Sequence, residues 1–277
     1  WLHLLSIRKF VLMAIVCFLE AGCASTGLIL PEGPSRPFVD YQGRFNQATD
    51  PCQRVRTMQV AMRVNAESRQ TTFRGEVLGA LSRPASLRLV GVAPFGLPGF
   101  ILVAKLDDAA VLVLPREKRV VTATAVEDLL SMVVGVSLST EDLLAVLTGC
   151  VVPAPEPQQA KIYENGWIGV TVDPESTVYL QTVDNVPVIV AGRRPGLTAW
   201  YSDHVRGLPR RIDLRARDGS GRTSSLAVTL SQLSVNIDLQ PEVFSAETPD
   251  DYVYMTLEEF QSEGETLGNN GLLVPPQ

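Results

Sequence analysis

A single histidine beside a carboxylate is the first place where this chain could do chemistry. His204 follows Asp203 in "WYSDHVRG", and a carboxylate can orient an imidazole for general-base catalysis. The sequence has no serine-nucleophile motif, paired-histidine motif or Cys-x-x-Cys pattern to accompany them. We therefore predict that His204 is a surface residue and that the chain is not an enzyme. We expect no catalytic residue, no metal and no cofactor.

Paired carboxylates occur at three places: Asp107-Asp108, Glu127-Asp128 and Glu141-Asp142. The first pair follows an apolar run, which is typical of a turn. The other two begin helical patterns, where acidic side chains interact favourably with the helix dipole. We therefore predict structural roles for all three. Lysine and arginine are scattered and the formal net charge is -6, which argues against a nucleic-acid partner.

The first part of the sequence predicts export. Arg8 and Lys9 precede the apolar run Phe10 to Leu19, and small residues follow at Ala21-Gly22. A basic segment, a short apolar segment and small residues are typical of a secretory signal peptide. The run is shorter than the roughly 20 residues that cross a bilayer as a helix. Residues 1–22 are therefore predicted to be a signal peptide.

The residues around Cys23 resemble the lipobox of bacterial lipoproteins, although Glu20 stands where that motif has an aliphatic residue. The resemblance implies that Cys23 is lipidated, for example with palmitate. Ala24, in place of aspartate, implies the outer membrane under the enteric sorting rule. The alternative is an ordinary signal peptide with an incidental Cys23. The Pro, Gly and Ser content that follows predicts a lipidated N-terminus and flexible tether over residues 23–50.

Cys52 and Cys150 remain as a possible pair. They either form a disulfide in an oxidising periplasm or stay as two buried free thiols.

From about Arg54 apolar and polar residues alternate, which predicts short antiparallel strands separated by turns. In "FILVA" and "AVLVL" both faces are apolar, so either both faces are covered or the sheet curls around something apolar. The period changes over 124–149, where two helices are expected. Thr124 and Gly135 bound the first, and Ser139 or Thr140 begins the second.

A proline-rich linker, "VVPAPEPQQA", leads to a second β region. Asn165-Gly166 and "DGSG" predict turns in this region. Residues 243–277 are acidic and predicted to be a largely disordered tail. Within that tail, only "PDDYVYMTLEEF" could add a local element.

The order of "SLRLVGV", "APFGLPG", "FILVAKL", the two helices and "LPRRIDLRARDGSGRTSSLAVTL" resembles the LolB-like branch of the LolA/LolB-type lipoprotein-sorting family. This resemblance implies a mainly β fold with short α-helices over residues 51–242. The expected architecture is an incomplete antiparallel β-barrel, or half-barrel, with a helical lid. Such a protein is anchored in the outer membrane, faces the periplasm and acts as a lipoprotein-localisation chaperone. It binds acyl chains of lipoproteins or lipids, helps insert them into the outer membrane, and could receive them from a periplasmic LolA-like carrier.

Candidate site residues follow from alternation and from the resemblance. The predicted acyl-cavity residues are Val60, Met62, Val64, Leu87, Leu89, Ile212 and Leu214. The predicted lid residues are Leu129, Leu130, Val133, Leu143 and Leu147. The predicted membrane-contact loop, in "GVAPFGLPGF", carries Phe95, Leu97 and Phe100.

A plain core residue has the same pattern as a cavity residue. The alternative function is therefore a structural or assembly lipoprotein of the envelope, with a filled β core, that binds another envelope protein.

Overall fold

The computed structural model describes residues 29–68, 72–93, 98–106 and 108–266. The described residues from Pro31 to Thr266 form one compact unit. No helix within the described ranges is long and apolar enough to cross a membrane. The predicted signal peptide, Cys23, Phe95, Leu97 and Asp107 lie outside the described residues.

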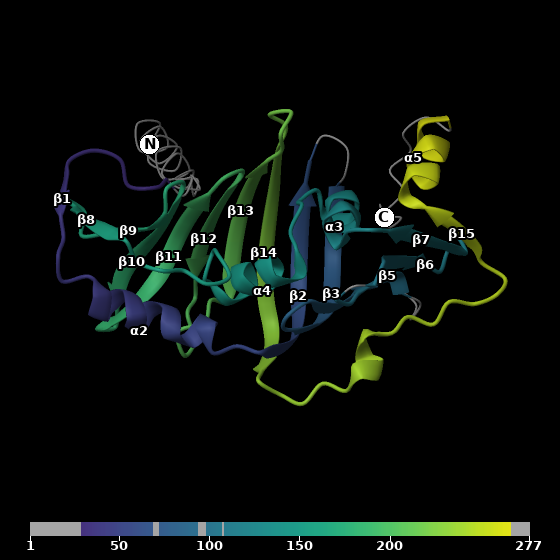
Figure 1. The fold of residues 1–277 in the computed structure, drawn as a ribbon, viewed down its shortest axis with the longest axis horizontal. Coiled ribbons are helices and arrows are strands. Elements are labelled where there is room, and N and C mark those ends of the chain that lie inside the picture. The colour runs from purple at the N-terminus through teal and green to yellow at the C-terminus, as the bar shows by residue number, and fades with distance from the viewer. Residues whose placement is uncertain (1–28, 69–71, 94–97, 107, 267–277) are drawn as a thin grey trace, which may run out of the picture. The chain divides into compact units, whose positions relative to one another are not determined.

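The described part of the chain is mainly β, as predicted, and its strands form one open sheet of 15 strands (Figure 1). Their order is β1-β8-β9-β10-β11-β12-β13-β14-β2-β3-β4-β5-β6-β7-β15. Two antiparallel meanders therefore meet where β14 pairs with β2. The strands are β1 Ser35–Pro37, β2 Thr57–Glu67, β3 Thr72–Ser82, β4 Ser86–Val92, β5 Pro98–Ala104, β6 Ala110–Leu114, β7 Arg119–Ala123, β8 Gln159–Tyr163, β9 Ile168–Asp173, β10 Ser176–Val183, β11 Val186–Arg194, β12 Leu197–Ser202, β13 Arg211–Arg217, β14 Thr223–Val235 and β15 Val253–Thr256.

The predicted alternation is confirmed in β2. Val60, Met62 and Val64 are buried, whereas Gln59 and Arg63 are exposed. The two predicted turns are also present, because β8 pairs with β9 across Asn165-Gly166 and β13 pairs with β14 across "DGSG".

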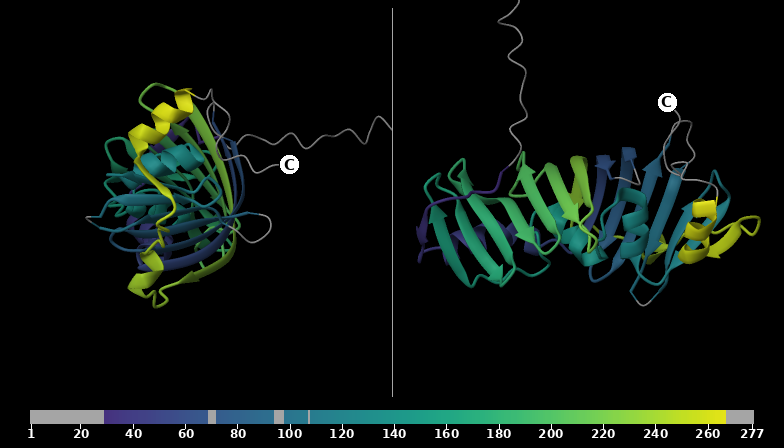
Figure 2. Two further views of the ribbon diagram at one scale, coloured as in Figure 1. Left: turned by 90° about the vertical axis from the view of Figure 1, so that its right-hand side faces the viewer. Right: turned by 90° about the horizontal axis from the view of Figure 1, so that it is seen from above.

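Helices α2 Gln42–Gln53, α3 Val126–Val134 and α4 Thr140–Thr148 cover one face of this sheet. The C-terminal segment adds the 3-10 helix η2 Pro241–Phe244 and α5 Leu257–Thr266. In Figure 1, α2, α4 and α3 lie in front of the strands, and Figure 2 shows the sheet curving around them, so this is its concave face.

The caps of the two predicted helices follow the sequence in part. The Ser139 Oγ accepts a hydrogen bond from the Asp142 N–H at 3.0 Å and caps α4. Gly135 ends α3 in the left-handed conformation that glycine adopts without steric cost. The predicted Thr124 cap is wrong, because the N-cap of α3 is Ala125 and makes no side-chain hydrogen bond.

The tether predicted over residues 23–50 is wrong at its C-terminal end, where α2 forms. Phe45, Ala48, Thr49 and Cys52 are buried at i, i+3, i+4 and i+7. This spacing gives a helix one apolar stripe. The stripe packs against β11, so residues 42–50 belong to the folded unit.

The prediction of a largely disordered tail is wrong for residues 243–266. β15 pairs in parallel with β7, and α5 follows it, within the "PDDYVYMTLEEF" stretch and just beyond it. Phe244 is buried, and together with Val103 and Val111 it lines a cavity of about 320 Å³. The apolar outer face of β5 and β6 is therefore covered by this C-terminal segment. The Arg88 Nη1 fastens the segment by donating to the Ser245 carbonyl oxygen at 2.7 Å.

Candidate functional site on the concave face

The predicted cavity residues share one face of the sheet. Val64 lies opposite Val228, which in turn lies opposite Ile212. Leu89 lies on the same face on the other side of β3, opposite Gly79. The exposed fraction is 5% or less for every member: Val60, Met62, Val64, Leu87, Leu89, Ile212 and Leu214.

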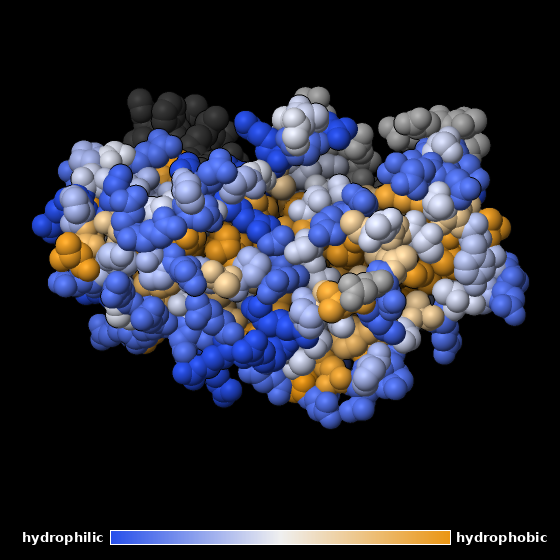
Figure 3. All heavy atoms as spheres, in the orientation of Figure 1, coloured by the Kyte–Doolittle hydropathy of each residue, from blue (hydrophilic) through white to orange (hydrophobic). Residues whose placement is uncertain are grey.

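The predicted lid residues cover this face. Leu129, Leu130 and Val133 point from α3 into the core, and Leu143 and Leu147 do so from α4. The cavity and lid residues belong to one hydrophobic cluster. In this structure helix side chains therefore occupy the space above the concave face. Seen from the helix side, hydrophobic atoms reach the surface in separate patches bordered by hydrophilic atoms (Figure 3).

Phe100, predicted to contact a membrane, is instead a core residue with 2% exposure. Its ring lies edge-on to Phe73, with centroids 5.9 Å apart. It also lies directly over Gly91, where any Cβ would overlap the ring, 2.4 Å from one of its carbon atoms. Glycine in β4 thus lets this ring pack on the concave face. Phe95 and Leu97, the other members of the predicted loop, are outside the described residues.

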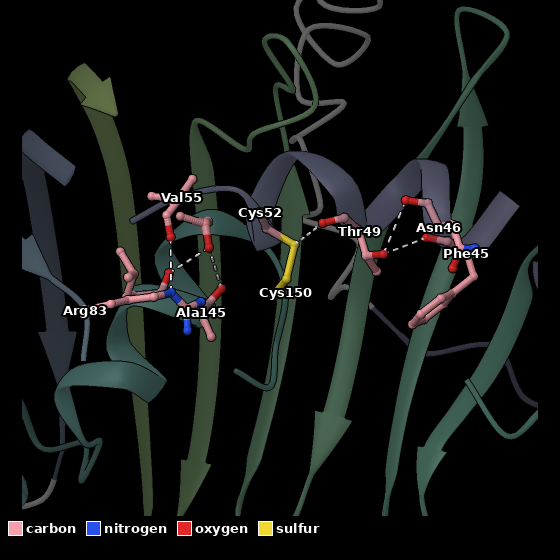
Figure 4. Close-up of a disulfide and its surroundings, with 10 residues drawn as sticks. Phe45, Asn46, Thr49, Cys52, Val55, Arg83, Ala145 and Cys150 are labelled. Atoms are coloured by element: carbon pink, nitrogen blue, oxygen red, sulfur yellow. Dashed lines mark hydrogen bonds between the residues drawn. A yellow bond between two sulfur atoms is a disulfide. The ribbon is translucent and has the colours of Figure 1, made fainter. Parts of the chain in front are cut away.

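A disulfide between Cys52 and Cys150 joins α2 to the segment after α4 (Figure 4). The Cα atoms are 5.7 Å apart, and both cysteines are buried. Close to it, the Thr49 Oγ donates to the Phe45 carbonyl oxygen at 2.9 Å inside α2, which satisfies a buried hydroxyl. Of the two alternatives left by the sequence, the structure contains the disulfide.

Two arginines, one in the β3–β4 turn and one at the end of β11, hold the first turn of α4. The Arg83 Nη1 lies 2.7 Å from a Glu141 carboxylate oxygen, and the Arg83 Nε donates to the Val55 carbonyl oxygen at 3.1 Å. Arg194, at the end of β11, pairs with Asp142. Both arginine side chains are 16% exposed. The Glu141-Asp142 pair therefore has two roles. It holds α4 in place through ion pairs with these arginines, and it lies in the first turn of α4, where acidic side chains interact favourably with the helix dipole.

His204 does not join this site. Its Nε2 lies 2.9 Å from the Ile189 carbonyl oxygen. Burial lowers the pKa of His204, and the contacts with Ile189 and Asp203 act in the opposite direction. The residue is therefore half-buried and not simply on the surface. No group of three or more His, Cys, Asp or Glu side chains within the described ranges is arranged to hold a metal ion.

Sequence reasoning missed α2, Tyr201 and the two arginine contacts. Tyr201 lies opposite Ile212 on the concave face, and its complete burial raises the pKa of the phenol. The helical spacing of apolar residues from Phe45 to Cys52 does predict α2. However, Pro51 and the Pro-rich stretch before the helix favour an irregular segment, so the helix was not predicted. Arg83 and Arg194 carried no such signal, because their partners lie more than 50 residues away in the sequence.

Comparison with known proteins gives distant structural likenesses. No protein-family model matches this chain, and no curated protein matches it in sequence. A LolA superfamily protein from Nitrosomonas europaea is 13% identical with a TM-score of 0.45, covering 76% of this chain and 99% of that one.

Two further structures are at a similar distance. A DUF1329 family protein from Desulfovibrio piger is 12% identical with a TM-score of 0.44, covering 71% of this chain and 92% of that one. A domain provisionally described as an outer membrane lipoprotein-sorting protein, from Vibrio parahaemolyticus, is 12% identical with a TM-score of 0.42, covering 74% and 94%.

Proposed function

We propose that this chain is a cell-envelope lipoprotein that binds acyl chains of lipoproteins or lipids on the concave face of its sheet. It would be anchored in the outer membrane through Cys23 and help insert its cargo there, without catalysing a reaction. The observation that carries the proposal is the continuous apolar face formed by both meanders, with short amphipathic helices laid across it. Such a face binds hydrocarbon without directional groups.

Acyl binding at this face requires a helix to move, because helix side chains fill it. The two helices differ in how they are held. α4 is fixed by the disulfide next to its C-terminal end and by Arg83 and Arg194 at its first turn. α3 lies on β3, β6 and β7 through Leu129, Leu130 and Val133. In this proposal α3 is the lid of the half-barrel, and α4 is a fixed wall.

The free energy gained by burying a long acyl chain is comparable to the free energy lost when α3 withdraws from the sheet. Withdrawing the four buried aliphatic side chains of α3, Val126, Leu129, Leu130 and Val133, costs roughly 6–12 kcal/mol at 1.5–3 kcal/mol each. A palmitoyl chain, with about 14 methylene groups at about 0.8 kcal/mol each, gains about 11 kcal/mol on full burial. Burial of a palmitoyl chain can therefore offset the withdrawal of α3 over most of this range, whereas burial of a four-carbon chain cannot. This difference supplies a matched control.

A photoreactive palmitate analogue tests the proposal on the unmodified protein. After irradiation, mass spectrometry should find label on inward-facing residues such as Val64 and Leu89, and not on outward-facing Arg63. A four-carbon photoreactive acid should give no label at these positions. Depletion of the protein should also leave other lipoproteins in the periplasm. Palmitate labelling that persists in Cys23→Ala would contradict the anchor.

A second function is favoured by the complete burial of the concave face. A structural or assembly lipoprotein with a permanently filled core would bind another envelope protein through its outer surface and would take no acyl probe. Absence of label at Val64 and Leu89, together with cross-linking to another envelope protein, would support this second function.

A further inference from the structure

A polar pocket of about 200 Å³ lies at one end of the strands, where several connections meet. The α3–α4 connection contributes Gly135 to Leu138, and the β11–β12 connection contributes Arg194 to Leu197. The end of β13, the β13–β14 turn and the start of β14 add further walls, with Arg217 and Arg222 among their residues. The pocket therefore opens beside the C-terminal end of α3.

The charges in this pocket are predominantly positive. Three arginines line it, Arg194, Arg217 and Arg222, against one carboxylate, Asp218. Asp218 is already engaged, because one oxygen accepts from the Arg222 Nε at 2.7 Å and the other from the Ser220 Oγ at 2.7 Å. The same contacts fix the β13–β14 turn and hold the stem of Arg222. In a chain of net charge -6, this grouping of guanidinium groups is a local exception.

The arginines differ in how far they are already neutralised. Arg194 pairs with Asp142, and Arg222 uses its Nε for Asp218. The side chain of Arg217 has no ion pair within the described residues and is exposed. The guanidinium of Arg217 and the terminal amino groups of Arg222 are therefore available for an anion. Guanidinium groups suit phosphate because two parallel N–H donors match two phosphate oxygens.

The lining of the pocket is polar at its rim and apolar next to the core. Ser131, Ser137 and Ser224 add hydroxyl groups to its lining. Leu138 and Leu197 also line it, but they are 4% and 5% exposed and belong to the core cluster above the concave face. A polar rim therefore adjoins the apolar core, which is the order of polarity in an amphiphile with an anionic head.

We propose that this pocket binds a phosphate group, and that the headgroup of an amphiphile held on the concave face is its source. The choice of source rests on the proposed acyl-binding function, whereas the phosphate site rests on the arginines alone. Arg217 and Arg222 contact the phosphate oxygens, and the serine hydroxyls donate to the same group. The acyl chain continues past Leu138 toward the space that α3 covers.

Calorimetric titration of the full chain in an uncharged detergent tests this with three probes: dihexanoylphosphatidate, dihexanoylglycerol and inorganic phosphate. Dihexanoylphosphatidate should bind more tightly than the other two. Arg217→Ala and Arg222→Gln should each raise its Kd about tenfold, the loss expected for one charge-assisted hydrogen bond. Arg116→Ala, an exposed arginine in the β6–β7 turn, is the matched control and should leave the Kd unchanged.

The probes separate the two sources of phosphate. If inorganic phosphate binds as tightly as dihexanoylphosphatidate and is weakened by the same substitutions, the phosphate site is supported with free phosphate as its source. Equal Kd values for dihexanoylphosphatidate and dihexanoylglycerol, or no effect of either arginine substitution, overturn the site. In that case binding of dihexanoylglycerol would leave the acyl-binding function standing. Binding of inorganic phosphate without binding of either six-carbon probe would support the pocket with free phosphate as its source. The acyl-binding function is then tested separately by the photoreactive palmitate analogue, whose chain is long enough to replace α3.

Discussion

Cys52 in α2 and Cys150 after α4 lie 98 residues apart in sequence and are joined across the helix layer by a disulfide. The bond closes a loop that contains six strands and two helices, from β2 to α4. It therefore links the N-terminal helix to the helix that forms the fixed wall of the candidate site.

Removing this disulfide should lower the free energy of unfolding substantially. Closing a loop of about 100 residues stabilises a folded chain by about 4–5 kcal/mol in the chain-entropy model. We expect Cys52→Ala/Cys150→Ala to lose most of this amount in urea denaturation. Reductant should destabilise the unsubstituted chain but not the double variant. Equal stability of the two proteins under oxidising conditions would show that the bond does not form.

The contact of Arg83 with Glu141 should contribute to stability more than an exposed ion pair does. Arg83→Met leaves the Val55 carbonyl oxygen and Glu141 without their donor, and we expect a loss of about 1–3 kcal/mol in the free energy of unfolding. Arg211 is the control, because its contact with Asp213 at 3.2 Å has the arginine 52% exposed. Arg211→Met should cost less than about 1 kcal/mol. Equal losses for the two variants would contradict a bracing role for Arg83.

His204 should make the stability of the fold depend on pH. Burial lowers its pKa in the folded state, so the unfolded chain binds a proton more readily. The stability from the neutral imidazole is fully present above the unfolded pKa of about 6.5 and is lost as the pH falls through the folded pKa. We expect His204→Gln to have a shallower decline in unfolding free energy below about pH 6.5 than the unsubstituted chain. Parallel pH profiles would show that His204 does not titrate in this way.

Phe95 tests the remaining part of the predicted membrane-contact loop. Phe95→Glu should leave folding and acyl binding unchanged but reduce delivery of acylated cargo to liposomes, because a carboxylate is unfavourable where an aromatic ring would enter the bilayer interface. Leu106→Glu is the control, since Leu106 is 57% exposed in the turn between β5 and β6. A loss of folding in Phe95→Glu would instead place this side chain in the core, as the structure does for Phe100.

The local elements could be predicted from neighbouring residues alone. Alternation around Met62 specifies a half-buried strand, and Ser139 with Gly149 bounds α4, because these features depend on neighbouring residues and on hydrogen bonds within a few positions. The cavity and lid residues could likewise be assigned to apolar faces. Alternation states that a side chain is on an apolar face and does not state what covers it.

Which elements pack against one another became clear only from the folded chain. It placed β14 beside β2, bonded Cys52 to Cys150 and brought Arg83 to Glu141. It also placed Phe100 of the "GVAPFGLPGF" stretch over Gly91 in the core. The physical reason is that buried contacts and ion pairs form between residues distant in the sequence. Local sequence patterns therefore do not identify the partners.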